Sequence, residues 1–240
     1  MDKTKFEFVS EVVVGRDFRG ENIDRFWSVD SLFVDCVFDG LRLGWGKESS
    51  LSFGAGPSQS VYQNCSFDRA RLHIRTAGNT RFESCSFVET TIKDWWAFDV
   101  ELIDCTFSGR LTRSWFNGSV QPQYVELIGR SLNEFRGNDF SAARLEDVEF
   151  RTGIDLSAQV LPTGPDYLLV PDAAVAVEKA ADILQQIPDV KLRTEALSHL
   201  SVDRSNVEMG QSQLFIGSLG YSKRGLQALR AVMDAHRQSR

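Results

Sequence analysis

A six-residue pattern of apolar and polar positions recurs along the first two thirds of the chain. It consists of a large apolar residue, two polar residues, Cys, a small polar residue and Phe, as in Phe82–Phe87. Three consecutive copies place Cys65, Cys85 and Cys105 at equal intervals (85 − 65 = 20; 105 − 85 = 20). A fixed period of this length is typical of a solenoid, in which each repeat buries its apolar face by stacking on its neighbours.

The same register extends in both directions and defines two columns of apolar residues. The first column contains Phe18, Phe38, Phe67, Phe87, Phe107 and Phe140. The second lies five positions later and contains Ile23, Leu43, Leu72, Ile92 and Leu145, with Thr112 as an exception. A step of five fits neither a helix nor a flat strand. It predicts short extended sides joined by tight corners, four sides to a coil, with corners expected at Asp39-Gly40, Gly78-Asn79 and Ser108-Gly109.

Two gaps interrupt the period. The interval from Cys36 to Cys65 is 29 (65 − 36 = 29), an excess of 9, and that from Cys105 to Asn138 is 33 (138 − 105 = 33), an excess of 13. Insertions into a stacked array leave it as loops, so we expect loop insertions near 46–58 and 113–134. The first is rich in Gly, Ser and Pro, which is typical of a surface loop. The second is rich in Trp, Phe, Tyr and Arg, the residue types of interface hot spots.

The two ends of the chain depart from the repeat. Residues 1–14 alternate apolar and polar positions, which predicts a strand that caps the first coil. Residues 157–171 carry several prolines and predict a linker. In residues 172–240 the apolar positions recur with a helical period. This pattern predicts helices capped at Asp172 and Asp189, a third element around 214–219, and a last helix over 222–238. These helices would cap the last coil or form a homodimer with a second chain, and the sequence leaves both open.

Composition narrows the classes of function. The chain has 240 residues and a net charge of −6, all of it on residues 1–165, which disfavours direct nucleic-acid binding. No apolar run approaches the roughly 20 residues needed to cross a bilayer. The first residues lack the order of a signal peptide. We therefore expect a cytoplasmic protein that does not contact membranes.

No chemical motif stands out. The four Cys occupy one position of the repeat, which predicts buried thiols rather than a metal site. His73, His199 and His236 lie far apart in the sequence, without metal-ligand spacing. Phosphate-binding loops, nucleophile elbows and dinucleotide fingerprints are absent from the sequence. We therefore expect no enzyme, no cofactor and no metal.

The pair Trp95-Trp96 is the first candidate for partner binding. Neighbouring residues on an extended side point to opposite faces, so one indole is expected inside and one outside. Trp115 follows Trp95 by one full period (115 − 95 = 20) and is expected to stack on it in the buried column, which leaves Trp96 exposed. The partner-binding candidates from the two insertions and this pair are Trp96, Arg113, Trp115, Phe116, Tyr124, Trp45 and Phe53.

The segments Cys65–Leu72 and Asn138–Phe150 resemble pentapeptide repeats, with Phe or Leu at the centre and a small residue two positions earlier. The resemblance covers roughly residues 15–156 and implies a right-handed quadrilateral β-helix, here with a C-terminal α-helical domain or cap. A rod with flat sides and two protruding loops offers a large surface, so we expect a non-catalytic scaffold that binds another macromolecule, a protein, through the faces of the β-helix and the protruding loops. Two alternatives stay open: a DNA mimic that protects a topoisomerase such as DNA gyrase, and an immunity or effector protein whose partner is a bacterial toxin.

Overall fold

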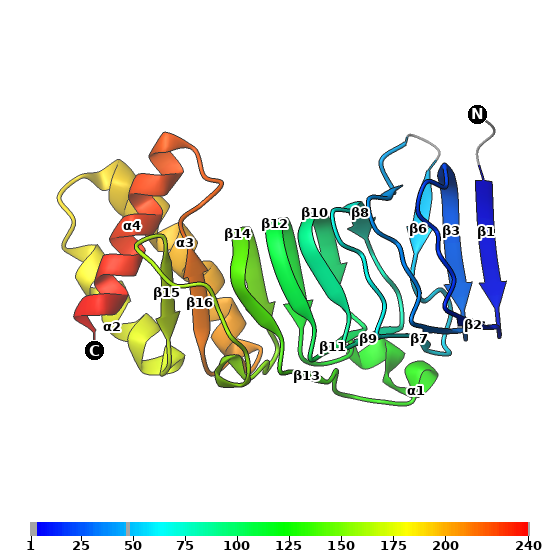
Figure 1. The fold of residues 1–240 in the computed structure, drawn as a ribbon. Coiled ribbons are helices and arrows are strands. Elements are labelled where there is room, and N and C mark those ends of the chain that lie inside the picture. Colours follow the sequence, from blue (N-terminus) through cyan, green and yellow to red (C-terminus); the bar gives the residue numbers. More distant parts are fainter. Residues whose placement is uncertain (1–3, 47–48, 240) are drawn as a thin grey trace.

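The computed structural model describes residues 4–46 and 49–239 (Figure 1). Parallel sheets occupy the N-terminal two thirds of the chain, and three helices gather at the C-terminal end. Within each sheet, neighbouring strands come from successive turns of the chain, as in the pairing of Phe33 with Tyr62 and of Tyr62 with Phe82. The protein is therefore mainly β in this part, and its parallel sheets fit a β-helix.

Three parallel sheets are formed by the described residues, and we name them A, B and C. Sheet A contains β1 (Thr4–Val9), β3 (Ile23–Val29) and β6 (Ser50–Ser52). Sheet B contains β2 (Val12–Val14), β4 (Leu32–Val34), β7 (Ser60–Gln63), β9 (Thr80–Glu83), β11 (Val100–Ile103) and β13 (Phe135–Arg136). Sheet C contains β5 (Arg42–Leu43), β8 (Arg71–Arg75), β10 (Ser86–Ala97), β12 (Thr106–Asn117) and β14 (Asp139–Arg151).

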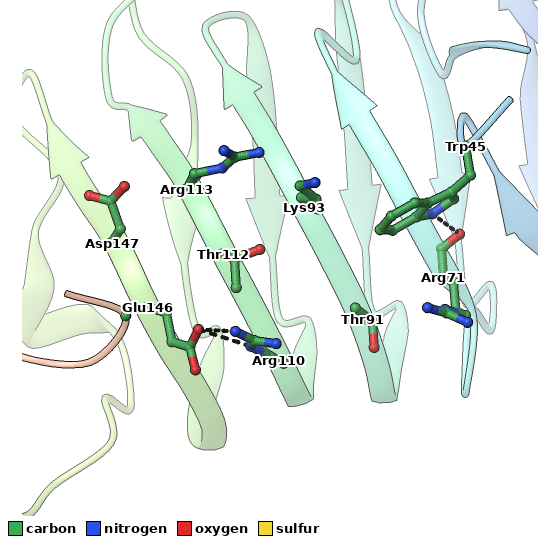
Figure 2. Close-up of a pocket in the computed structure, with 10 residues that line it drawn as sticks. Trp45, Arg71, Thr91, Lys93, Arg110, Thr112, Arg113, Glu146 and Asp147 are labelled. Carbon is green, nitrogen blue, oxygen red and sulfur yellow. Dashed lines mark hydrogen bonds and ion pairs between the residues drawn. The ribbon is translucent and has the colours of Figure 1, made fainter. Parts of the chain in front are cut away.

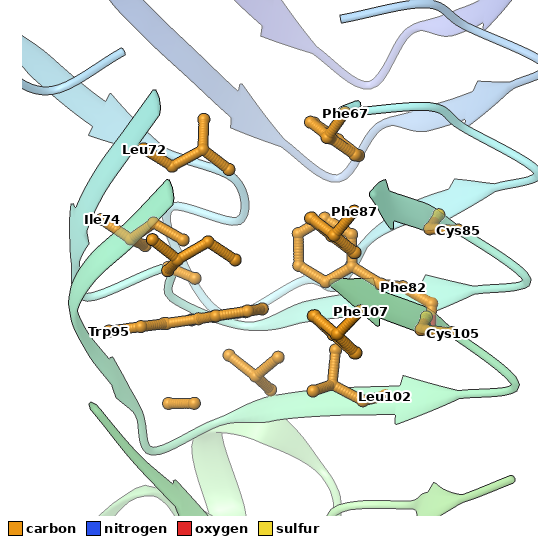
Figure 3. Close-up of a cluster of buried hydrophobic side chains, with 14 of the residues drawn as sticks. Phe67, Leu72, Ile74, Phe82, Cys85, Phe87, Trp95, Leu102, Cys105 and Phe107 are labelled. Carbon is orange, nitrogen blue, oxygen red and sulfur yellow. The ribbon is translucent and has the colours of Figure 1, made fainter. Parts of the chain in front are cut away.

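The predicted phenylalanine column forms the centre of the core (Figure 3). The rings of Phe67 and Phe87 stack with centroids 4.9 Å apart, and those of Phe87 and Phe107 with centroids 4.8 Å apart. Both spacings match the distance between hydrogen-bonded strands, so one ring is added with each coil. The four cysteines are buried and free, which confirms the expected column of buried thiols.

Residues with a left-handed backbone conformation form corners between the strands. The residue before each Cys has a φ between 52° and 54°: Asp35, Asn64, Ser84 and Asp104. At the expected corner Gly78, where φ is 76°, an added Cβ would lie 2.0 Å from the carbonyl oxygen of Gly54. Only glycine fits at that position, because the backbones of two coils touch there.

The first insertion differs from its prediction, because it divides into two parts. Phe26 pairs with Leu51 (51 − 26 = 25), and Phe33 pairs with Tyr62 (62 − 33 = 29). Compared with the regular period, five of the nine extra positions therefore precede Leu51 and four follow it. Between the two parts the chain returns to the sheet as β6, so the prediction of one loop near 46–58 was wrong. Residues 47 and 48 lie outside the described residues.

The register also explains the exception at Thr112. Phe87 pairs with Phe107 (107 − 87 = 20), but Ile92 pairs with Leu111 (111 − 92 = 19). An irregularity near Gly109, where φ is 87°, shortens this coil by one position. Leu111 therefore occupies the core position, and Thr112 points outward.

The second insertion is shorter than predicted. Residues 113–117 are the end of β12 and pair with β14. The chain leaves the sheet only after Asn117, forms η1 (Pro122–Tyr124) and α1 (Val125–Ile128), and returns as β13. Placing Arg113, Trp115 and Phe116 in a loop was therefore wrong, because these residues belong to β12, whose end pairs with β14.

The strand predicted over residues 1–14 divides in two, because β1 and β2 belong to different sheets, and residues 1–3 lie outside the described residues. β1 pairs with β3 and lies at the edge of sheet A. Phe8 is buried against the core. The guanidinium of Arg16 lies 4.8 Å from the ring centroid of Phe6 and 4.6 Å from that of Phe18, so it covers the aromatic core at this end.

The C-terminal region has its own core, formed by α2 (Ala173–Gln185), α3 (Val190–Glu208) and α4 (Lys223–Gln238). Asp189 caps α3 as predicted, whereas the side chain of Asp172 makes no capping hydrogen bond. β15 (Tyr167–Val170) lies within the stretch predicted as a linker and forms an antiparallel pair with β16 (Leu214–Gly217). The element around 214–219 is thus a strand, because its apolar side chains pair with β15 and pack between the two cores.

The C-terminal region packs directly on the last coil. The ring of Phe215 lies 6.0 Å from that of Phe150. Gln211 Oε1 accepts hydrogen bonds from the backbone amides of Gly153 and Ile154, both at 3.0 Å. This arrangement covers the end of the stack. Among the described residues, none of the helices has the length and apolar character to cross a membrane.

Candidate partner-binding surface

A column of five outward side chains, four of them arginines, runs across the outer face of sheet C. The strand register aligns Arg42 with Arg71, Arg71 with Thr91, Thr91 with Arg110, and Arg110 with Arg144. Each of these residues directly precedes a buried aliphatic residue: Leu43, Leu72, Ile92, Leu111 and Leu145. Because side chains alternate along a strand, burial of the second residue turns the first toward solvent. We call these five outward residues the arginine ladder.

A groove of about 450 Å³ lies on this face, beside the ladder. Figure 2 shows its basic residues on successive strands, with Arg71 and Trp45 at one end and Glu146 and Asp147 at the other. Gly220, from the segment between β16 and α4, closes the acidic end. The groove therefore runs across the strands rather than along them.

Three cationic side chains contact Trp45 at the end of the groove opposite Glu146 and Asp147, which we call the open end. Its indole nitrogen donates a hydrogen bond to the carbonyl oxygen of Arg71 at 2.9 Å. The guanidinium carbons of Arg42 and Arg71 and the Nζ atom of Lys93 each lie 5.5 Å from its ring centroid. A cation near an aromatic face is attracted by the ring quadrupole, so the indole holds together three side chains that repel one another.

Carboxylates neutralise the other end of the ladder. Glu146 is buried and accepts hydrogen bonds from Arg110 Nε at 2.9 Å and from Arg144 Nε at 2.5 Å. Burial favours the neutral form of Glu146, but the hydrogen bonds and charges of the two arginines outweigh it and lower its pKa. Arg113 pairs with Asp94 at 2.7 Å. Along residues 4–46 and 49–239, in contrast, no carboxylate forms an ion pair with Arg42, Arg71 or Lys93.

Trp96 and Trp115 also lie on sheet C, near the C-terminal ends of β10 and β12. Their rings stack with centroids 5.5 Å apart and planes 7° apart, and both side chains are partly exposed. Arg151 lies over Trp115, 4.7 Å from its ring centroid. The prediction that Trp115 stacks on buried Trp95 was wrong, because the shortened coil places it beside Trp96. Trp95 is fully buried and Trp96 faces outward, as predicted.

Two of the partner-binding candidates are core residues. Phe53 is fully buried and packs against Phe82, with ring centroids 5.4 Å apart. Phe116 is 1% exposed and stacks on Phe150, with centroids 5.6 Å apart. Both were placed in insertions, but Phe53 directly follows β6 and Phe116 lies near the end of β12, and each side chain points into the core. Neither residue is available to a partner.

The remaining candidates divide between two places. Trp45 and Arg113 line the groove. Tyr124 is exposed on the second insertion and does not line the groove. The structure therefore brings together two of the seven predicted residues in one depression and puts Trp96 and Trp115 on the same sheet.

The arginine ladder escaped the sequence analysis, although the chain carries a signal for it. The dipeptide Arg-Leu occurs at 42–43, 71–72, 110–111 and 144–145. In each case the Leu is the second-column core residue. The repeated residue just before this column could have indicated an outward basic row on one face.

Comparisons with known proteins add little. No family model matches the chain, and no curated protein matches it. Two solved structures of QnrB1, a plasmid-mediated fluoroquinolone resistance protein, both trypsin-treated variants, are similar to it. The first is 16% identical with a TM-score of 0.19 and matches 64% of this chain and 79% of that chain. The second is 13% identical with a TM-score of 0.22 and matches 65% of this chain and 80% of that chain.

Proposed function

We propose that this protein is a non-catalytic scaffold of the pentapeptide-repeat type, a right-handed quadrilateral β-helix that binds another protein through the outer face of sheet C. The observation that carries the proposal is the combination on that face of exposed arginines with partly exposed tryptophans. Arg and Trp are the residue types most enriched in binding hot spots.

The build of the fold favours binding. Parallel ladders and stacked rings hold the strands of sheet C in register, so the outward side chains stand on a rigid base. A preformed surface loses little conformational entropy when a partner docks. Across the described ranges, no cluster of three or more His, Cys, Asp or Glu residues is arranged to hold a metal ion.

A role as a DNA mimic has less support than a general protein scaffold. Such a mimic needs free carboxylates in a row. Asp39 and Asp68 instead accept hydrogen bonds from backbone amides of the next coil, Asp68 N at 2.9 Å and Val88 N at 2.8 Å. A topoisomerase is nevertheless included in the test as a defined partner.

The test is a pull-down with the purified full chain as bait, from bacterial lysate and from solutions of purified gyrase subunits. We compare wild type with Trp115→Ser and Trp27→Ser. Trp27 is 41% exposed on sheet A and carries Arg25 over its ring at 5.3 Å, so it is a matched indole–arginine pair on another face. Circular dichroism checks that each variant is folded.

We expect a protein that wild type and Trp27→Ser retain and that Trp115→Ser retains about tenfold less, in line with the loss of one hot-spot side chain. Retention of the same protein by all three baits would contradict the assignment to sheet C. Enrichment of no protein by wild type over uncoupled resin would contradict the scaffold function itself.

A further inference from the structure

We propose that the groove on sheet C binds an extended acidic segment of the partner protein, with carboxylate side chains seated on Arg42, Arg71 and Lys93. This inference rests on the proposed function and specifies the chemistry of the partner. The one ligand class to which it commits is a protein segment rich in Asp and Glu.

The groove reverses the charge of the molecule locally. Among the described residues, four basic side chains line it, Arg71, Lys93, Arg110 and Arg113, against two acidic ones, Glu146 and Asp147. The chain as a whole has a net charge of −6. A basic depression on an acidic protein directs an anionic partner to one place and repels it from the remaining surface.

The open end of the groove has cations that no anion of the described residues compensates. Arg110, Arg113 and Arg144 have carboxylate partners within the chain. Arg71 and Lys93 line the groove and surround Trp45 together with Arg42, which contacts Trp45 but is not among the lining residues. Their charges are held close together before any ligand arrives, so an incoming carboxylate relieves their mutual repulsion and finds donors already in place.

The spacing fits an extended peptide. From Arg42 on β5 to Lys93 on β10 the sheet crosses two strand intervals, a span of about 10 Å at about 4.8 Å for each interval. Side chains on one face of an extended peptide recur about every 7 Å. Two acidic residues at alternate positions therefore fall within this span. The planar guanidinium fork is the group that binds a carboxylate through two parallel hydrogen bonds.

A single-stranded nucleic acid fits less well. Proteins that bind it combine a basic path with several aromatic platforms on which bases stack. Of the described residues, Trp45 supplies the one indole of the groove, and the faces of Trp96 and Trp115 cover each other. At its far end a phosphate backbone would meet Glu146 and Asp147. Nucleic acid binding is therefore treated as an outcome that overturns the proposal.

The experiment uses the full chain and a fluorescein-labelled peptide of alternating Glu and Ser, followed by fluorescence anisotropy. A Lys-Ser peptide and a single-stranded oligonucleotide are measured in parallel. Affinity for the acidic peptide is expected to fall as salt rises, because the contacts are charged and exposed. Binding is also expected to change tryptophan fluorescence in wild type and much less in Trp45→Phe.

Arg71→Glu is the decisive variant, and Arg69→Glu is its control. The two arginines lie in one coil, separated by one residue and both exposed, but Arg69 is outside the groove and lies 3.9 Å from Asp39. Reversing the charge at Arg71 is expected to weaken peptide binding about tenfold or more, the size of one charge-assisted contact. Arg69→Glu is expected to leave it within about twofold of wild type.

Three results would overturn the inference: no binding of the acidic peptide, equal weakening by both variants, or tighter binding of the oligonucleotide. Failure of the inference is distinguishable from failure of the proposed function. If a captured partner is lost with Trp115→Ser but retained fully by Arg71→Glu, the scaffold function holds and the acidic segment does not.

Discussion

Charged side chains in two regions of the surface make different kinds of contact. Four aspartates lie directly before or after phenylalanines of the buried column, and we call them the aspartate edge: Asp17, Asp39, Asp68 and Asp139. Each of these carboxylates accepts a hydrogen bond from a backbone amide two positions on or in the next coil. On sheet C, the arginine ladder projects from the strands, and Arg42 and Arg71 contact an indole rather than a carboxylate of the described residues.

The comparison shows that the contacts of a charged surface side chain indicate its role better than the sign of its charge does. Hydrogen bonds from Arg19 lower the pKa of Asp17 to about 2, and those from Ser141 lower the pKa of Asp139. These carboxylates close turns and join coils. The side chains of Arg42 and Arg71 in the ladder contact Trp45 and make no comparable hydrogen bonds between coils in the described structure. Their position therefore favours a role in binding over a role in folding.

The largest expected effect is on the core that both regions share. Phe87→Ala removes a fully buried ring that stacks on Phe67 and Phe107. It should lower the free energy of unfolding by about 3–5 kcal/mol, the usual cost of such a cavity. Chemical denaturation followed by circular dichroism measures it. A loss below about 1 kcal/mol would mean that the ring column is not the basis of the fold.

A pair of substitutions in one coil separates the two regions directly. Asp68→Ala removes an acceptor bonded to Ser86 Oγ at 2.5 Å and to Val88 N at 2.8 Å, and should cost about 1.5–3 kcal/mol of stability. Arg71→Ala loses only a contact with a partly exposed indole and should cost less than about 1 kcal/mol. Chemical denaturation of the two variants measures both losses in the free energy of unfolding. Equal costs would remove the distinction between a structural edge and a binding ladder.

The smallest expected effect concerns Glu146, the carboxylate that closes the basic row. Its pKa in the folded protein lies below the ordinary value of 4.5. The ionised form therefore stabilises the fold above that pH, and this contribution is lost as the pH falls through the folded pKa. Thermal unfolding of wild type and Glu146→Gln should differ at neutral pH, with a gap that narrows in acid. A gap independent of pH would contradict the ion pairs with Arg110 and Arg144.

Several features of the fold followed from the sequence. The spacing of Phe67, Phe87 and Phe107 predicted the stacked column, because a ring can return to one inner corner only when each coil has the same length. The spacing of the cysteines predicted their burial for the same reason. The helices over 173–185, 190–208 and 223–238 followed from apolar periodicity and capping residues.

Other features depended on register, which local pattern does not determine. A coil shortened by one position placed Leu111 in the core and paired Trp115 with Trp96. Return of the chain as β6 buried Phe53, although its neighbours resemble a loop. Pairing with β15 made residues 214–217 a strand.

The sequence by itself determined the repeat, its aromatic interior and the position of the helices, because these depend on which residues avoid water at a regular interval. Only the tertiary structure decided which outward residues meet. Arg42, Arg71 and Lys93 come from three separate strands of the chain and converge on Trp45 only because parallel strands stack. The candidate site is a product of that stacking.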